Sequence, residues 1–402
     1  MKLAYVSPLP PQRSGIADYS AALLPHLRPY CERLVAVVET GVKPVLPAGV
    51  FDAFYDASDS SWWAAERAIP LYHMGNHSVY HRYIYNLLQR FPGITVLHDG
   101  SLLPFINAVT LESGARANFV RELSFAEGAG GAALAWQYLR GEAVLTPEKH
   151  SMLARVCAES LGIIVHSDYM QRRVEQVTSQ TPIVVIPMLD MTPVEAKAYS
   201  LAESRSRLGL EREAILLGAF GYIAPTKRLE TVLHTLIGLR ATYPQLRLIC
   251  VGQIVEGYDF MERVNTMGLQ DVVRVTGYVS PTEFALYLQA IDIGLNLRYP
   301  TWGEMSATLM RLLAAAKPVL VTDTASFSDL PDAVVCKVPY GADEASVLEA
   351  LLRRLIADAA WREAIGNAAC VYVNQYCDPA IIAQQYAAFI QSTTYDRFTV
   401  SS

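Results

Sequence analysis

The sequence lacks the features that mark several protein classes. It has no block rich in Lys or Arg, and its 33 Lys and Arg residues against 39 Asp and Glu residues give a formal net charge of −6. A large nucleic-acid-binding face is therefore not expected, although a small electropositive cleft stays open. No apolar run approaches the ~20 residues of a membrane-spanning helix. We expect neither a nucleic-acid partner nor a membrane span, and peripheral membrane contact is left open.

Signals for export and for disulfide bonding are absent as well. The first residues, "MKLAYVSPLPPQRSG", predict a strand and a proline-rich loop without the long apolar segment of a signal peptide. We expect a cytoplasmic location, with the inner face of the membrane as an alternative place of action. The cysteines have no C-x-x-C spacing, which favours reduced packing residues. They are Cys31, Cys157, Cys250, Cys336, Cys370 and Cys377.

The composition is that of a globular chain with more than one core: 402 residues, of which 52% are hydrophobic and 18% charged. Short β-branched runs alternate with longer amphipathic runs, which predicts an α/β protein with parallel sheets and crossover helices. The strands expected in the first half are "KLAYVS", "RLVAVVE", "IPLYHM", "ITVLHD", "GIIVHS" and "PIVVIP". Those expected in the second half are "AILLGAF", "RLICVG", "VVRVTGYV", "IDIGLNL", "PVLVTD" and "AVVCKV".

The run of expected strands is interrupted once, by the polar segment 187–210. We therefore predict an N-terminal Rossmann-like domain over residues 1–190 and a C-terminal one over residues 191–377. A final helical stretch over 378–402 is expected to pack back toward the N-terminal domain.

Sheets of this kind bind ligands where a strand ends and a helix begins. In the first half, Gly15 precedes a helix whose free backbone N–H groups can face an anion, and a plain turn is the alternative. His98 ends the strand "ITVLHDG", where an imidazole can donate to or accept from a bound hydroxyl, and a core histidine is the alternative. The fingerprint G-x-G-x-x-G is absent here. The glycines of "EGAGGAALAW" follow no strand and predict a close helix contact.

Three histidines recur at intervals of four residues in "YHMGNHSVYH", namely His73, His77 and His81. On one helix they would form a row that can bind zinc or nickel. The pair Gly75-Asn76 interrupts the row, because glycine is a poor helix-interior residue and the pair favours a turn. We expect the row to break at its first member, and the pattern alone leaves open whether the remaining histidines bind a metal.

Two loops of the second half have residues suited to a diphosphate sugar. "GAFGYIAPTKRLETV" brings Lys227 and Arg228 to a helix start, where two cations can meet a diphosphate; a solvated basic pair is the alternative.

In "LNLRYPTWGEMSATLM", Gly303 lets a ligand approach the backbone, and the N–H groups of Met305 and Ser306 at the expected helix start can hold phosphate oxygens. Glu304 can accept hydrogen bonds from sugar hydroxyls. The alternative is that the Glu304 carboxylate only interacts favourably with the positive end of the helix dipole.

Taken together, these segments resemble those of the retaining nucleotide-sugar glycosyltransferases of the GT-B fold, specifically glycosyltransferase family 4. The resemblance runs almost end to end, through "SGIADYS", "GNHSVYH", "VLHDG", "IIVHSDYM", "GAFGYIAPTKRLETVL", "VTGYVS" and "NLRYPTWGEMSATLMRLLAAAKPVLVTD". It implies two Rossmann-like domains whose parallel sheets face a central cleft. It also implies a nucleoside diphosphate sugar as donor and a glycan, lipid-linked or protein acceptor, with no cofactor and no metal.

The resemblance implies roles for single residues. His98 would contact the donor sugar and stabilise charge at the reacting carbon, Lys227 would neutralise the diphosphate, and Glu304 would hold sugar hydroxyls. The residues that would line the rest of the donor site are Gly15, Gly221, Arg228, Gly252, Tyr278, Val279, Gly303, Met305 and Ser306.

Two positions depart from the family pattern. The second of two glutamates spaced eight residues apart, which would hold the ribose, is replaced by Leu312, with Arg311 before it. The arginine after the glycine of the "FG" turn is replaced by Tyr222. The favoured hypothesis is a retaining glycosyltransferase of bacterial polysaccharide or glycoconjugate assembly. A catalytically inactive GT-B subunit that binds a glycan or a partner enzyme is the alternative, and a sugar-nucleotide epimerase or a phosphorylase is a third reading.

Overall fold

The structure is a computed structural model that describes residues 1–192 and 198–399. The contacts divide the chain into two compact units. Unit 1 comprises Met1–Leu189, Trp302–Met305 and Pro379–Ser402, and unit 2 comprises Asp190–Thr301 and Ser306–Asp378. The main difference from the expected division is the short loop Trp302–Met305, which the sequence pattern assigns to the second domain.

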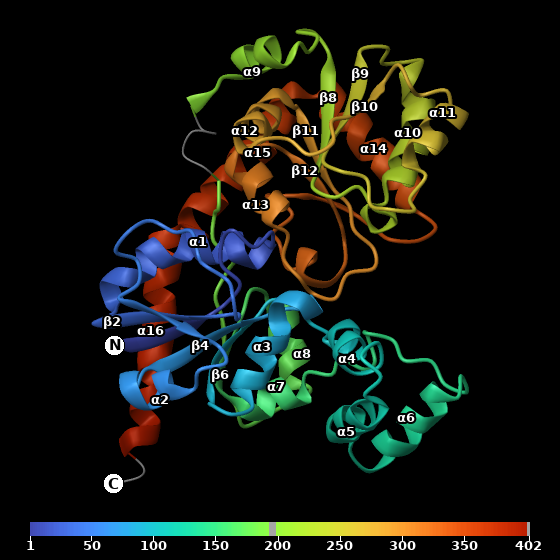
Figure 1. The fold of residues 1–402 in the computed structure, drawn as a ribbon. Helices are drawn as coiled ribbons and strands as arrows, with labels where there is room; N and C mark the ends of the chain where they lie inside the picture. Colours follow the sequence, from blue (N-terminus) through green and yellow to red (C-terminus); the bar gives the residue numbers. More distant parts are fainter. Residues whose placement is uncertain (193–197, 400–402) are drawn as a thin grey trace. The chain divides into compact units, whose positions relative to one another are not determined.

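Unit 1 is built on a parallel sheet. Within the described residues this sheet has seven strands in the order β3-β2-β1-β4-β5-β6-β7 (Figure 1). Along the chain they are β1 (Lys2–Val6), β2 (Arg33–Val38), β3 (Ala53–Asp56), β4 (Ile69–Met74), β5 (Gly93–Leu97), β6 (Ser160–Val165) and β7 (Ile183–Val185). Every neighbouring pair is parallel, so the carboxyl ends of all strands lie at the same edge.

Helices cover this sheet because its strands are apolar on both sides. They are α1 (Gly15–Leu27), α2 (Ser61–Glu66), α3 (Ser78–Leu88), α4 (Leu103–Thr110), α5 (Arg116–Glu127), α6 (Gly131–Leu139), α7 (Ala154–Glu159), α8 (Asp168–Glu175) and α16 (Pro379–Thr399). One core joins strand residues such as Val6 and Tyr72 to side chains of α3, α4, α5, α7 and α8. The last helix, α16, packs on α1 and β6, and the buried hydroxyls of Tyr19 and Tyr386 lie 2.7 Å apart.

Unit 2 repeats the design with a second parallel sheet. Among its described residues the sheet has six strands in the order β10-β9-β8-β11-β12-β13. They are β8 (Ile215–Phe220), β9 (Leu246–Val251), β10 (Val273–Val275), β11 (Ile293–Asn296), β12 (Val319–Thr322) and β13 (Cys336–Val338). The helices are α9 (Leu201–Leu208), α10 (Leu229–Arg240), α11 (Phe260–Thr266), α12 (Pro281–Ala290), α13 (Ala307–Ala314), α14 (Glu344–Ala357) and α15 (Ala359–Tyr376).

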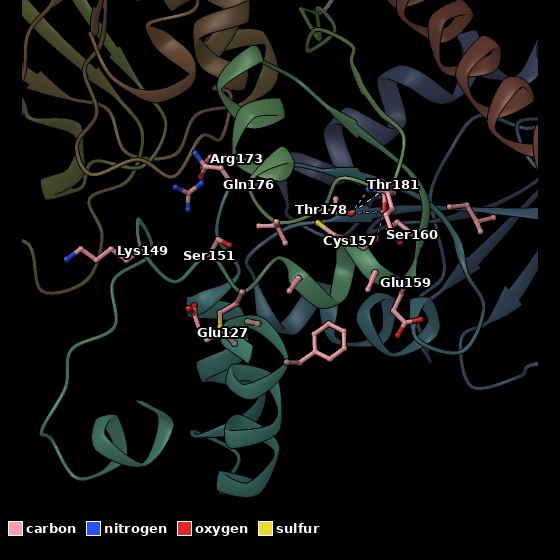
Figure 2. A pocket seen from close by; sticks show the side chains of 18 of the residues that line it. Glu127, Lys149, Ser151, Cys157, Glu159, Ser160, Arg173, Gln176, Thr178 and Thr181 are labelled. Carbon is pink, nitrogen blue, oxygen red and sulfur yellow. Dashed lines mark hydrogen bonds between the residues drawn. The ribbon is translucent and has the colours of Figure 1, made fainter. Parts of the chain in front are cut away.

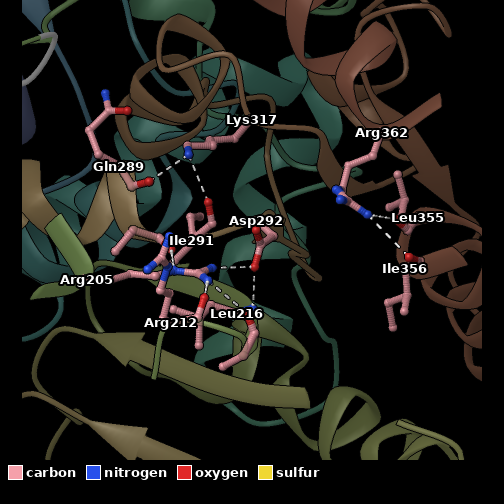
Figure 3. A network of polar contacts seen from close by, with 12 residues as sticks. Arg205, Arg212, Leu216, Gln289, Ile291, Asp292, Lys317, Leu355, Ile356 and Arg362 are labelled. Atoms are coloured by element: carbon pink, nitrogen blue, oxygen red, sulfur yellow. Dashed lines mark hydrogen bonds and ion pairs between the residues drawn. The ribbon is translucent and has the colours of Figure 1, made fainter. Parts of the chain in front are cut away.

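A buried ionic network fastens α9 to this sheet (Figure 3). The Arg205 guanidinium, 4% exposed, donates to the Asp292 carboxylate at 2.7 Å and to the backbone carbonyl of Ala290 at 3.0 Å. Lys317 donates to the carbonyls of Gln289 and Ile291, both at 2.9 Å. The two cations therefore satisfy carbonyl groups at the end of α12 that have no partner within the helix.

The predicted α/β class is confirmed, and each hydrophobic run predicted as a strand forms one. The strand β3 was not predicted from the sequence, because it is a partly exposed edge strand of four residues with little apolar pattern. The segment 187–210 is less of a linker than expected, because α9 packs on α12; its residues 193–197 lie outside the described part.

Two smaller expectations concern packing. A side chain at Gly131 would place its Cβ 2.4 Å from the Leu123 carbonyl oxygen, so the predicted close helix contact, between α5 and α6, is confirmed. All six cysteines are free thiols, and only Cys370 among them is not fully buried, which confirms their reading as reduced packing residues. Among the described residues, none of the helices combines the length and apolarity of a membrane-spanning segment.

Candidate functional site

Three histidines from neighbouring strands meet at the carboxyl edge of the unit 1 sheet. His73 lies in β4, His98 directly follows β5, and His166 directly follows β6. Their side chains converge because β4, β5 and β6 are parallel neighbours. The ring centroids are 5.3 Å apart for His73 and His98, and 5.0 Å apart for His98 and His166. Tyr19 of α1 packs edge-on against His98 at 5.2 Å.

These imidazoles are held in the neutral form. Burial keeps the pKa of His98 well below its usual value, and the nearby His166 and His73 lower it further. Burial also lowers the pKa of His166 to about 4. Nδ1 of His73 and Nε2 of His98 lie 3.1 Å apart, which fixes complementary tautomers. His98 can thus act on a ligand as a neutral dipole of fixed orientation.

The histidine row of the sequence is broken as predicted. His73 lies in β4, His77 is the N-cap of α3, and His81 lies within that helix. Nδ1 of His81 is 2.9 Å from the backbone carbonyl of His77. Within residues 1–192 and 198–399, no group of three or more His, Cys, Asp or Glu side chains is arranged to hold a metal ion.

The loop after β4 is fastened to the loop after β5. The Asn76 backbone N–H donates to the Asp99 carboxylate at 2.8 Å, and the Asn76 side-chain amide donates to the Ser101 carbonyl at 2.6 Å. A Cβ at Gly75 would lie 2.7 Å from Ile16 of α1. The segment that carries His98 therefore has little freedom to move away from the start of α1.

Gly15 is the first residue of α1, as predicted for the start of a helix. Its N-cap Ser14 accepts from the Ile16 N–H at 3.2 Å, so this N–H of the helix is already satisfied. Nothing lies within 4 Å of an added Cβ at Gly15, so the backbone there is open to a ligand.

The loop Trp302–Met305 packs on residues of unit 1. A Cβ at Gly100 would lie 2.0 Å from the Trp302 carbonyl oxygen, and a Cβ at Gly303 would lie 2.6 Å from the sulfur of Met170. Gly303 has φ +95°, a left-handed conformation that favours glycine. The Glu304 carboxylate accepts from the Trp302 backbone N–H at 2.8 Å, which turns the loop back on itself.

The expected helix start at Glu304, Met305 and Ser306 is correct for Ser306 alone, which is the N-cap. The helix α13 starts at Ala307, and Ser306 is its N-cap, with a hydroxyl that accepts from the Leu309 N–H at 3.3 Å and donates to Asn296 at 2.9 Å. Met305 and Ser306 precede the helix, because a serine side chain competes for the first N–H groups. Their own N–H groups belong to a loop rather than to a helix end.

In unit 2, Lys227 ends a short 3₁₀ turn (Pro225–Lys227) that follows β8. Its ammonium donates to the Phe220 carbonyl at the end of β8, and a Cβ at Gly221 would lie 3.3 Å from Nζ. Burial, and then the charge of Arg298, lowers the pKa of Lys227 from 10.5 to about 7. A diphosphate near this amine would favour its charged form.

Arg228 directly precedes α10, as predicted, but its guanidinium is engaged elsewhere. It forms a two-fold ion pair with the buried carboxylate of Glu344, the first residue of α14. It also lies over the Tyr340 ring at 5.1 Å, and that ring stacks on Tyr299 with centroids 3.4 Å apart. Lys227 is therefore the better candidate of the two cations for a phosphate.

The loops after β8 and β9 touch through their glycines. Gly252 has φ +152°, and a Cβ there would lie 2.1 Å from the Gly221 carbonyl oxygen. Backbone hydrogen bonds continue the contact, such as that from the Ile223 N–H to the Gln253 carbonyl at 2.8 Å. Tyr278 is 77% exposed and Val279 partly exposed, in the stretch that follows β10.

The two departures from the family pattern have different surroundings. The Leu312 side chain is fully buried and packs on Gly294 of β11, so this position belongs to the core. The Arg311 guanidinium lies over the Phe284 ring at 5.3 Å. Tyr222 is 67% exposed.

The structure thus groups the predicted site residues in two sets. His98, Gly15, Gly303, Glu304 and Met305 lie in unit 1. The set in unit 2 consists of Gly221, Lys227, Arg228, Gly252, Tyr278, Val279 and Ser306. The contacts of His98 with His73 and His166 were not predicted from the sequence. The signal that identified His98, a histidine at the end of a buried strand, is also present for His73 in "IPLYHM" and for His166 in "GIIVHS".

Comparison with known proteins assigns unit 2. Residues 212–358 match the family model described as Glycosyl transferases group 1. Over 161 residues the chain is 27% identical to an alpha-monoglucosyldiacylglycerol synthase of Streptococcus pneumoniae. That alignment covers 39% of this chain and only 36% of the relative's length.

Two solved structures match along nearly the whole chain. A sucrose-phosphate synthase from Thermosynechococcus elongatus has a TM-score of 0.67 at 16% identity and covers 100% of both chains. Alr3699/HepE from Anabaena, in complex with UDP and glucose, has a TM-score of 0.64 at 15% identity and covers 98% of this chain and 100% of that chain. At these identities the likeness concerns the fold alone. Residues 212–358 therefore match a group 1 glycosyltransferase domain, and the chain has the two α/β units of the GT-B fold.

Proposed function

We propose that the protein is a retaining glycosyltransferase that moves a sugar from a nucleoside diphosphate sugar to an acceptor hydroxyl. The observation that carries the proposal is Lys227. It lies inside the segment that matches the group 1 glycosyltransferases, its amine is at the carboxyl end of β8, and it adjoins the left-handed Gly221. Ligands of parallel α/β sheets bind at this edge, and a half-buried lysine there is suited to an anion.

The proposed reaction needs charge stabilisation more than a nucleophile. The bond between the anomeric carbon and the diphosphate oxygen breaks, and the acceptor oxygen forms its bond on the same face of the sugar. The acceptor proton passes to the departing diphosphate, whose charge Lys227 balances. His98, neutral and oriented by His73, faces charge that develops at the reacting carbon, and Glu304 holds sugar hydroxyls. In this scheme no metal and no cofactor take part.

A uridine diphosphate sugar is the first donor to test. Alr3699/HepE was solved with UDP and glucose, and the relative in Streptococcus pneumoniae is named for a glucosyl product. The acceptor class stays a glycan, a lipid-linked sugar or a protein, within polysaccharide or glycoconjugate assembly. Action in the cytoplasm or at the inner face of the membrane stays a prediction.

One observation favours a second candidate, an inactive subunit that binds a glycan or a partner enzyme. Leu312 stands where the family has a ribose-binding carboxylate, and its side chain is enclosed in the core of unit 2. No carboxylate at that position is available to a nucleotide.

A turnover assay separates the two candidates. The purified protein is incubated with UDP-, GDP-, ADP- and dTDP-sugars and a panel of simple glycans as acceptors, in the presence of chelator. Released nucleoside diphosphate and the glycoside product are both measured. We expect release from one donor class, with a loss of about 10²-fold in Lys227→Met and in Glu304→Gln. The exposed Lys43 provides the matched control Lys43→Met, which is expected to keep full activity. Near-normal turnover of Lys227→Met would remove Lys227 from the mechanism, and an inverted anomeric configuration in the product would refute retention.

A further inference from the structure

Unit 1 contains a pocket of about 760 Å³ that the proposed reaction does not use (Figure 2). Its walls come from α5, α7, α8 and the segment 148–154, and it extends to Pro92 and Ser160 at the amino ends of β5 and β6. The pocket therefore reaches the edge of the sheet opposite to the one that carries His98.

The charges around this pocket do not suit a phosphate. Three carboxylates, those of Glu127, Glu148 and Glu159, line it together with two cations, Lys149 and Arg173. The Arg173 guanidinium donates to the carbonyls of Gly100, Pro147 and Glu148 at 2.9, 2.8 and 3.1 Å. Three of its five N–H groups are thus used within the protein, and the three carboxylates outnumber the two cations that line the pocket.

Neutral hydrogen-bonding groups are present instead. The side-chain amides of Gln176 and Gln180 line the pocket and make no hydrogen bond to any of the residues that the structure describes. Each amide offers donors and an acceptor, which is the combination that neighbouring hydroxyls of a sugar require. The carboxylates of Glu127 and Glu159 add acceptors for further hydroxyls.

An aromatic ring completes the set. Phe125 of α5 lines the pocket and is 45% exposed. The guanidinium of Arg155 lies over this ring at 4.2 Å, and Arg155 is itself held by the Glu122 carboxylate at 2.7 Å. The ring is therefore kept in place with Arg155 over one face. The part of the ring that lines the pocket can contact the weakly positive C–H groups of a pyranose.

We propose that this pocket is a binding site for a neutral glycan chain, separate from the site of sugar transfer. A volume of about 760 Å³ is large enough for a ligand of several sugar rings. The proposal goes beyond the proposed transferase activity and does not rest on it, because it concerns other residues and needs no nucleotide.

The position of the site gives it access to the loop of His98. Arg173 joins the pocket wall at 147–148 to Gly100, two residues after His98, and the Leu102 N–H donates to the Ser151 carbonyl at 2.7 Å. A glycan bound against the segment 147–151 would therefore contact a segment that is hydrogen-bonded directly to the loop after β5.

The test is direct binding without nucleotide. Maltohexaose, cellohexaose and β-1,4-mannohexaose are titrated to about 10 mM against the full chain, by calorimetry and by saturation-transfer NMR. We expect at least one to bind, with an affinity about tenfold lower in Phe125→Ala and again lower in Gln176→Ala/Gln180→Ala. Trp136→Ala is the matched control: Trp136 of α6 is a similarly exposed aromatic residue, at 49%, outside the pocket.

Several results would overturn the proposal. These are no binding by any of the three oligosaccharides, equal affinity of the wild type and both pocket variants, or an equal loss in Trp136→Ala. All substituted side chains are exposed, so thermal unfolding is expected to stay unchanged and the comparison stays valid. Donor turnover measured on the same samples keeps the two proposals apart: glycan binding without turnover refutes the transferase alone, and turnover without glycan binding refutes the pocket alone.

Discussion

The protonation of Lys227 is expected to control the binding of the donor diphosphate. Burial lowers the pKa of this amine from 10.5 to about 7, which corresponds to about 5 kcal/mol in favour of the neutral form. A diphosphate with two negative charges at about 4 Å contributes about 4 kcal/mol per charge at an effective dielectric constant of about 20. The sum of about 8 kcal/mol exceeds the cost, so Lys227 is charged in the complex.

The sign of the pH dependence follows from these values. Below about pH 7 the free protein already carries the proton, and binding takes up none. Above pH 7 the free amine is neutral and must gain a proton on binding, so the affinity falls by about tenfold for each further pH unit. Between pH 7 and about pH 8.5 we expect a loss of about sixteenfold, because half of the amine is already neutral at pH 7.

Calorimetry of nucleotide-sugar binding measures this directly, with UDP-glucose as the first ligand because its diphosphate charge is constant over this range. Titrations in buffers of different ionisation enthalpy give the protons taken up, and we expect nearly one at about pH 8.5. Lys227→Arg, which stays charged, is expected to bind with the same affinity at every pH. An affinity of the wild type that does not change with pH, or a Lys227→Arg variant with the same slope, would refute the reasoning.

Three further predictions concern stability. Asp292→Ala leaves a buried guanidinium without its carboxylate and should lower the free energy of unfolding by about 3–5 kcal/mol in urea titrations; a loss below about 1 kcal/mol would contradict the network. Gly252→Ala should lower the free energy of unfolding by about 3 kcal/mol, because the new Cβ would lie 2.1 Å from a carbonyl oxygen. The control Gly257→Ala has open space around it and should lower this free energy by only about 1 kcal/mol. Equal losses in the two variants would contradict the contact at Gly252. Arg33 lowers the pKa of Glu66 from 4.5 to about 2, so the wild type should lose stability as pH falls through this window. Glu66→Gln should lose less stability over the same window, and parallel pH profiles would contradict the pairing.

Most of the fold follows from local pattern, and the exceptions have physical reasons. Buried parallel strands are long apolar runs, so they are readable, whereas β3 at the sheet edge is short and partly exposed. The start of α13 depends on a competition between Glu304 as a first-turn residue and Ser306 as N-cap, and the serine hydroxyl decides it through contacts with Leu309 and Asn296.

Single residues of the candidate site could be predicted from the sequence, but the contacts between them could not. Position after a strand identified His98 and Lys227, because the carboxyl edge is defined by local sequence. The surroundings of these residues come from segments far apart in the chain. The pairing of Arg228 with Glu344 spans 116 positions, and the burial that lowers the pKa of Lys227 depends on the whole of unit 2. Neither has a signal in the sequence around the residue concerned.

The most direct test of the central claim is nucleotide binding in the presence of chelator. The purified protein is screened by thermal shift, and then by calorimetry, against UDP, GDP, ADP and dTDP. The account predicts that one nucleotide raises the unfolding temperature selectively and that Lys227→Met abolishes this effect while Lys43→Met preserves it. A folded protein that responds to none of the four nucleotides would contradict the account and would make Leu312 the decisive residue, in favour of a subunit that only binds.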